Sequence, residues 1–139
     1  MRDKIHFVKS SSQCPVVEFT LGSGNTGYAL VDTGSEITLV DEELAKNNKS
    51  SFHVDVTSDK VVMHGVAGSN EKPVIKARAT IAFTENGYQM EAILTTLNRL
   101  HVTDKKGKEY VISVIIGSDF LTEYKAKINY INSQLSLEQ

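Results

Sequence analysis

One carboxylate in this sequence stands where it could act on a bound water molecule. Asp32 follows the apolar residues 28–31 and precedes Thr33, Gly34 and Ser35. A glycine-containing turn at the end of a buried strand brings a side chain from the core to the surface and holds it rigidly. The Gly34 amide would then lie beside the carboxylate and favour its ionised form, and the Ser35 hydroxyl could donate a second hydrogen bond. The alternative is a carboxylate that only caps its own turn.

The other side chains that could bind a metal or attack a substrate are scattered. His6, His53 and His101 are isolated, and Cys14 is the single cysteine. Their spacing matches no metal-ligand pattern, and one cysteine cannot form an intrachain disulfide. We therefore expect no metal site, no cofactor and a partly buried thiol. His64 lies beside a glycine-rich segment, where it either contacts a ligand or is simply solvated.

Length and charge restrict the class of protein. The 139 residues predict a single domain over residues 1–139. The 15 basic and 17 acidic residues are scattered, which argues against nucleic acid as a partner. The sequence has no apolar run of signal-peptide or membrane-spanning length. We therefore expect no membrane association and a soluble, cytoplasmic protein, unless an export signal is removed from the natural chain.

Strands must position the turn that contains Asp32. Apolar and polar residues alternate in several segments, as is typical of half-buried strands. These segments are residues 16–21, 75–83 and 88–94. Glycine-containing turns predict hairpins between successive strands. The turns are residues 22–25, 85–87 and 104–107. The more uniformly apolar runs 28–31 and 111–116 are predicted to be strands buried on both faces.

Helices are predicted to be few and short. Residues 41–47 and 119–124 are the candidates, and each begins with an aspartate that can accept free amides of the first turn. We assign helix capping to Asp119 and leave it out of the catalytic residues. Alternating apolar residues near the end of the chain predict a terminal hairpin. These are Ile128, Tyr130, Leu135 and Leu137.

Three segments in the same order resemble the retropepsin-like aspartic peptidases, and the bacterial members more closely than the viral ones. Residues 30–40, LVDTGSEITLV, are similar to the active-site strand and turn of that family. Residues 61–68, VVMHGVAG, resemble its glycine-rich flap hairpin, and residues 114–121, VIIGSDFL, resemble the strand and turn that cross the active site. The resemblance covers roughly residues 16–137. It implies a mainly β fold, a retropepsin-like closed β-barrel (the acid protease fold) with a flap hairpin and one short C-terminal helix.

The resemblance also implies an activity, that of an aspartic endopeptidase acting as a homodimer. One chain has a single Asp-Thr-Gly, so the second catalytic carboxylate must come from Asp32 of a second copy. Two such groups share one proton, and together they activate a water molecule that attacks a peptide bond. A peptide or protein is the implied substrate. The alternatives are a catalytically silent dimer of the same fold that binds peptides, and a monomeric β domain with an accidental motif.

Supporting roles follow from the same resemblance. Thr33 would bond across the dimer axis, the Gly34 amide and the Ser35 hydroxyl would donate toward the carboxylate, and Gly117 would form the crossing turn. The implied flap residues are His64, Gly65, Val66, Ala67 and Gly68.

Four features are expected to be particular to this chain. Ala67 stands where the family has a flap glycine, Ser118 stands where viral members have a bracing arginine, and residues 95–110 form a longer loop. The apolar residues Val40, Val66 and 111–116 are expected to shape the substrate pocket.

Overall fold

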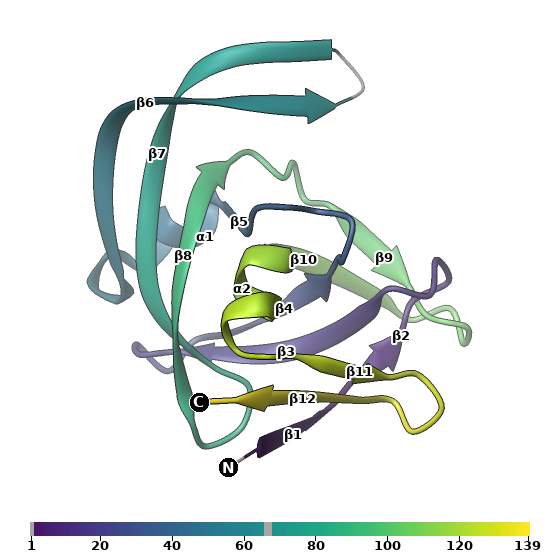
Figure 1. The fold of residues 1–139 in the computed structure, drawn as a ribbon. Coiled ribbons are helices and arrows are strands. Elements are labelled where there is room, and N and C mark those ends of the chain that lie inside the picture. Colours follow the sequence, from purple (N-terminus) through teal and green to yellow (C-terminus); the bar gives the residue numbers. More distant parts are fainter. Residues whose placement is uncertain (1, 66–67) are drawn as a thin grey trace.

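The computed structural model describes residues 2–65 and 68–139, without the side chains of residues 56–65 and 68–73. Strands dominate the described chain (Figure 1). Its first half contains β1 (Arg2–His6), β2 (Val8–Lys9), β3 (Pro15–Leu21), β4 (Thr26–Val31), β5 (Leu39–Asp41), α1 (Glu42–Asn47), the 3-10 turn η1 (Lys49–Ser51) and β6 (Phe52–Gly65). Its second half contains β7 (Gly68–Ala82), β8 (Gly87–Thr95), β9 (His101–Thr103), β10 (Glu109–Ile116), α2 (Ser118–Glu123), β11 (Lys127–Asn129) and β12 (Gln134–Glu138). The predicted mainly β fold with a short helix near the C-terminus is confirmed.

A closed barrel organises the molecule. Its strands follow one another in the order β3, β4, β10, β5, β8 and β7, and β7 returns to pair with β3 at Leu21 and Ile81. The predicted hairpins are confirmed between β3 and β4, between β7 and β8, and between β9 and β10. Two further pairs, β4 with β10 and β5 with β8, are parallel and were not predicted. Both bring together strands that lie far apart in the sequence.

The barrel interior is filled by the inward-facing residues of these strands. In β8, Tyr88, Met90 and Ala92 are buried and alternate with exposed residues, as the pattern of a half-buried strand predicts. Burial of each large apolar side chain contributes about 1.5–3 kcal/mol. The prediction that β10 is buried on both faces is wrong for its first half, because Val111 is 47% exposed. There β10 pairs with the short β9, where Val111 lies opposite His101.

The two helices within the described residues differ in how they begin. Asp41 precedes α1, and its side chain accepts a hydrogen bond from the Glu43 amide, which confirms the predicted cap. Helix α2 begins at Ser118, and Gly117 is its N-cap residue without a side-chain cap. Asp119 lies inside the first turn and is not the N-cap residue, but its carboxylate accepts a hydrogen bond from the Phe120 amide of that turn, as predicted. No helix in the described part of the chain is both long and apolar enough to cross a membrane.

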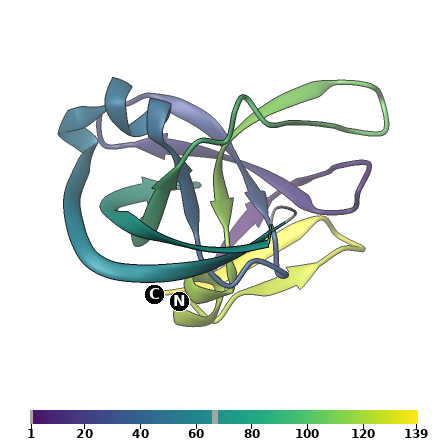
Figure 2. The same cartoon turned by 90° about the horizontal axis from the view of Figure 1, so that it is seen from above.

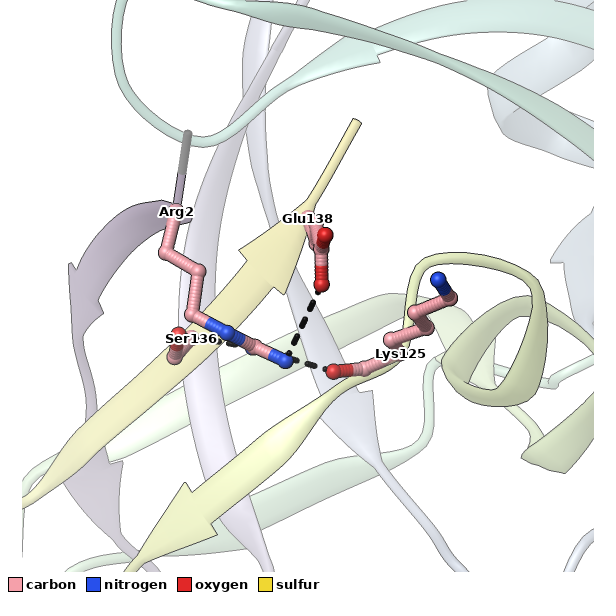
Figure 3. A network of polar contacts seen from close by, with 4 residues as sticks. All are labelled: Arg2, Lys125, Ser136 and Glu138. Carbon is pink, nitrogen blue, oxygen red and sulfur yellow. Dashed lines mark hydrogen bonds and ion pairs between the residues drawn. The ribbon is translucent and has the colours of Figure 1, made fainter.

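The two ends of the chain meet in a separate sheet, in the order β1, β12 and β11. Strand β1 pairs with β12 from Arg2 opposite Glu138 to His6 opposite Gln134. The Arg2 guanidinium donates to the Lys125 carbonyl oxygen at 3.0 Å and to the Ser136 hydroxyl at 3.0 Å, and it lies 3.3 Å from the Glu138 carboxylate (Figure 3). The N-terminal strand is thus attached to the strand that ends the chain.

The predicted terminal hairpin is confirmed as β11 and β12. Leu135 and Leu137 are fully buried, as expected. Tyr130 differs, because it is 43% exposed, although its ring forms a T-shaped pair with Phe7, at 6.1 Å between ring centroids. It lies in the turn between the two strands, where alternation no longer determines which face a side chain occupies.

The longest hairpin extends beyond the barrel. Strands β6 and β7 pair from Phe52 opposite Ala79 to Gly65 opposite Gly68, with an irregularity between Val56 and Lys60. In Figure 1 the far end of this hairpin stands apart from the barrel, above the turn between β4 and β5. Figure 2, seen from above, shows the two segments on the same side of the molecule.

Candidate active site

The turn between β4 and β5 presents the Asp32 carboxylate. Asp32 directly follows the last residue of β4, and its amide donates to the Ile116 carbonyl oxygen at 3.0 Å. The Gly34 amide donates to Asp32 Oδ1 at 3.0 Å, and the Ser35 amide donates to the Asp32 carbonyl oxygen at 3.1 Å. The side chain is half-buried. The predicted bond from the Gly34 amide is therefore present, and it fixes one carboxylate oxygen.

Glycine at position 34 leaves room for the Asp32 carboxylate. A Cβ at this position would lie 3.3 Å from Asp32 Oδ1, closer than most Cβ contacts. The conformation of Gly34 is not left-handed, so close approach to the carboxylate is the reason for this residue. Thr33, Gly34 and Glu36 are exposed, which leaves the outer side of the turn open.

The Ser35 hydroxyl does not have the predicted role in this structure. Its proton is donated to the Ile37 carbonyl oxygen, with 2.7 Å between the oxygens. A hydroxyl has one proton, so it is not donated to the Asp32 carboxylate at the same time. The carbonyl two residues further along the chain is the competing acceptor, a local arrangement that serine favours. Ser35 thus stabilises the turn.

Gly117 lies against this turn, as predicted for a crossing segment. It is buried, and a Cβ on it would lie 2.7 Å from the Ile37 carbonyl group. The next amide, that of Ser118, donates to the Ser35 carbonyl oxygen at 2.7 Å. This bond between backbone groups is one of those that join the two segments.

Two residues of the site were missed by sequence reasoning. Thr38 is fully buried, and it bonds to both Gly117 and Asp119. Its one sequence signal is a hydroxyl within the apolar run 37–40. Asp119 was interpreted as a helix cap, although its carboxylate reaches back to the turn that contains Asp32.

Three of the predicted flap residues lie at the end of the β6–β7 hairpin. His64 and Gly65 end β6, and Gly68 begins β7. Gly65 lies opposite Gly68 in the register, so the hairpin itself is present. Val66 and Ala67 lie outside the described residues, as does the side chain of His64.

The expected pocket residues are mostly part of the core. Val40, Val114 and Ile116 are fully buried inside the barrel, and Ile112 is buried in a second apolar cluster with Tyr110. The prediction that side chains shape a substrate pocket is therefore wrong for these four residues, whereas Val111 is exposed and Val66 lies outside the described residues. The apolar character of the four buried residues is explained by packing.

The described residues contain no group of three or more His, Cys, Asp and Glu side chains arranged to hold a metal ion. Cys14 is a free, partly buried cysteine, as predicted.

Comparisons with known proteins identify the fold. No protein-family model and no curated protein match the sequence. Among solved structures, the chain is similar to a retropepsin-like aspartic protease from Rickettsia conorii, with a TM-score of 0.57 and 9% identity over 99% of this chain and 91% of that one. It is also similar to the EIAV protease complexed with the inhibitor HBY-793, with a TM-score of 0.56 and 15% identity over 86% of this chain and 95% of that one. The chain has the retropepsin-like fold, as predicted.

Proposed function

We propose that this protein is an aspartic endopeptidase that acts as a homodimer of one-domain chains. The observation that supports this most is the Asp32 carboxylate, held by the Gly34 amide on an exposed turn of a retropepsin-like barrel. The fold alone would not imply catalysis, because one fold serves many functions. The hydrogen-bonded Asp32 carboxylate adds an accessible group that could act on a water molecule, which supports the proposal.

The exposed outer side of the turn supports a partner copy at this place. A two-fold axis beside Thr33 and Gly34 would bring the two Asp32 carboxylates together, so the dimer interface and the active site would coincide. Two carboxylates in contact cannot both be charged without a large repulsion, and they therefore share one proton. The charged group accepts a proton from the attacking water, and the protonated group donates to the carbonyl oxygen of the peptide.

The β6–β7 hairpin is proposed to be the flap that covers an extended peptide. Its position over the turn between β4 and β5 supports this role (Figures 1 and 2). A strand-like hairpin can bond to the backbone of an extended substrate and exclude water during the reaction. Peptide backbone recognition of this kind favours peptides and proteins as substrates.

Replacing the carboxylate tests the proposal. Asp32→Asn keeps the size of the side chain and removes the charge and the shared proton. We expect pepstatin-sensitive hydrolysis of an unstructured protein substrate to fall by on the order of 10³-fold or more. Sedimentation should show the same dimer as the wild type. The matched control is Glu85→Gln, an exposed acid-to-amide change in the turn between β7 and β8, which should leave the rate unchanged.

Two results would contradict the proposal in different ways. Equal rates for Asp32→Asn and the wild type would show that any hydrolysis does not use this carboxylate. A dimeric wild type that binds a peptide inhibitor and cleaves no peptide at any pH from acidic to neutral would support the silent peptide-binding dimer.

A further inference from the structure

Thr38 and Asp119 form a bonded pair at the end of the turn that presents Asp32. The Thr38 amide donates to Asp119 Oδ2 at 3.1 Å, and the Thr38 hydroxyl donates to Asp119 Oδ1 at 2.7 Å. Both oxygens of one carboxylate are thereby bonded to one residue, although the two residues are 81 positions apart in the sequence. Bonds to a charged acceptor are stronger than those between neutral groups.

The Thr38 hydroxyl also accepts a hydrogen bond from the segment that crosses the turn. The Gly117 amide donates to Thr38 Oγ1 at 3.1 Å, in a buried bond. Thr38 is itself fully buried, so its amide and hydroxyl depend on protein groups for their hydrogen bonds, although Asp119 itself is exposed. Thr38 therefore connects to the start of the crossing segment through Gly117 and to helix α2 through Asp119.

These bonds fix the far end of the segment 32–38, while another fixes its near end. At the near end, the Asp32 amide donates to the Ile116 carbonyl oxygen at 3.0 Å. Both ends of the segment 32–38 are therefore hydrogen-bonded to residues 116–119. Between these ends, where several residues are exposed, the Ser118 amide donates to the Ser35 carbonyl oxygen. Loosening the far end would allow the Asp32 carboxylate to move.

The arrangement uses both oxygens of the side chain at position 119 as hydrogen-bond acceptors. Its oxygens accept from the Thr38 amide, from the Thr38 hydroxyl and, at 2.8 Å, from the Phe120 amide. An ionised carboxylate only accepts hydrogen bonds, whereas an asparagine amide has one acceptor oxygen and brings two donor protons. At position 119, asparagine would leave one of these donors without an acceptor.

We propose that Asp119 is a positioning residue for catalysis, acting through Thr38 to hold the Asp32 turn in its reactive geometry. This inference rests on the proposed function, because it concerns the distance between the two Asp32 carboxylates of the dimer. A displacement of about 1 Å at a reacting group can reduce the rate by about 10²-fold. Substrate binding by other parts of the dimer would be affected much less.

The test separates positioning from folding. The variants are Asp119→Asn and Thr38→Val, the second of which keeps the shape of threonine and removes only its hydroxyl. In each folded, dimeric variant we expect kcat to fall by about 10- to 100-fold and KM to change by less than about threefold. Thr38→Ser should rescue most of kcat, because it retains the hydroxyl. Glu123→Gln, an exposed change in the same helix, is the matched control.

A second readout reports on the carboxylates themselves. A statine inhibitor places a hydroxyl between the two aspartates, and its deoxy counterpart lacks only that hydroxyl. The ratio of their inhibition constants should shrink by about tenfold or more in Asp119→Asn, since a displaced pair binds the hydroxyl poorly. A residue that merely stabilised the fold would lower both affinities together or neither.

Several outcomes overturn the proposal. An unchanged kcat or an unchanged ratio of inhibition constants in a folded, dimeric Asp119→Asn would contradict the positioning role. Unfolding of both Asp119→Asn and Thr38→Val would also contradict it, because the Thr38–Asp119 bonds would then stabilise the fold as a whole. A wild type that hydrolyses no peptide contradicts the proposed function, whereas an active wild type with an unaffected Asp119→Asn contradicts only the positioning role.

Discussion

At the scale of single residues, two glycines are determined by what lies next to them. Gly34 leaves room for the Asp32 carboxylate, and Gly117 lies against the backbone of the turn. A Cβ on Gly117 would come within 2.7 Å of the Ile37 carbonyl carbon and oxygen and within 2.8 Å of the Ser35 carbonyl oxygen. Backbone atoms cannot rotate away as a flexible side chain can, so the two segments would have to separate.

We therefore predict that Gly117→Ala lowers the free energy of unfolding by about 1–3 kcal/mol, the usual range for an overfilled core position. Urea denaturation measures this change through the transition midpoint. The control is Gly22→Ala, because a Cβ there meets nothing within 4 Å and the φ angle of Gly22 is not left-handed. It should stay within about 0.5 kcal/mol of the wild type. Equal midpoints for the two variants would refute the close approach.

Apart from Gly117, which the family resemblance indicated, the residues that sequence reasoning identified are those whose role depends on close neighbours in the chain. Asp32 and Gly34 are two positions apart, and their bond could be predicted from the turn alone. The Thr38–Asp119 bonds could not, because they depend on how two distant segments pack. The Ser35 hydroxyl was assigned to the wrong acceptor, since the sequence does not show which nearby oxygen it faces.

At the scale of elements, a buried tyrosine connects the N-terminal strand to the barrel. The Tyr88 hydroxyl in β8 donates to Asp3 Oδ2 in β1 at 2.9 Å, and Thr84 donates to the same carboxylate. Burial, the bond to Asp3 and the charge of Asp3 all raise the pKa of Tyr88. The phenol must lose its proton more readily in the unfolded chain than in the folded one.

This shift predicts a loss of stability in alkaline solution. Above a pH of about 10, the usual tyrosine pKa, unfolded chains lose the proton while folded Tyr88 keeps it. The unfolded state then binds fewer protons, so the free energy of unfolding falls as the pH rises. Thermal denaturation between pH 8 and 11, a range chosen to span that pKa of about 10, should show a steeper decline for the wild type than for Tyr88→Phe. Parallel declines would contradict the assignment.

Elements formed by local patterns were predicted well, and their long-range pairing was not. The turns at 22–25 and 85–87 join antiparallel neighbours as expected. The parallel pairing of β5 with β8 joins segments separated by the whole β6–β7 hairpin, and no local pattern specifies it. The alternation in residues 75–83 revealed only the second half of β7, which begins at Gly68.

At the scale of the whole molecule, the proposed active site is divided between two copies of the chain. Each copy has one Asp32, so a mixed dimer of wild-type and Asp32→Asn chains has a single catalytic carboxylate. Adding an equal amount of the variant should therefore reduce the hydrolysis rate of the wild type to about half, if chains exchange freely. Adding the Glu85→Gln chain should instead increase the rate. A rate that is unaffected by Asp32→Asn chains would show that a single copy is sufficient.

The joined ends of the chain have a mechanical consequence. Arg2 and Glu138 are partners at the outer end of an antiparallel pair, so the first and last described strands begin and finish at the same place. A force that pulls the two termini apart would break the hydrogen bonds between β1 and β12 one after another, beginning at Arg2 and ending at His6. The bonds would not share the force, as they would if the two strands were sheared past each other. Optical tweezers should therefore detach this strand at low force, before the barrel that holds Asp32 gives way.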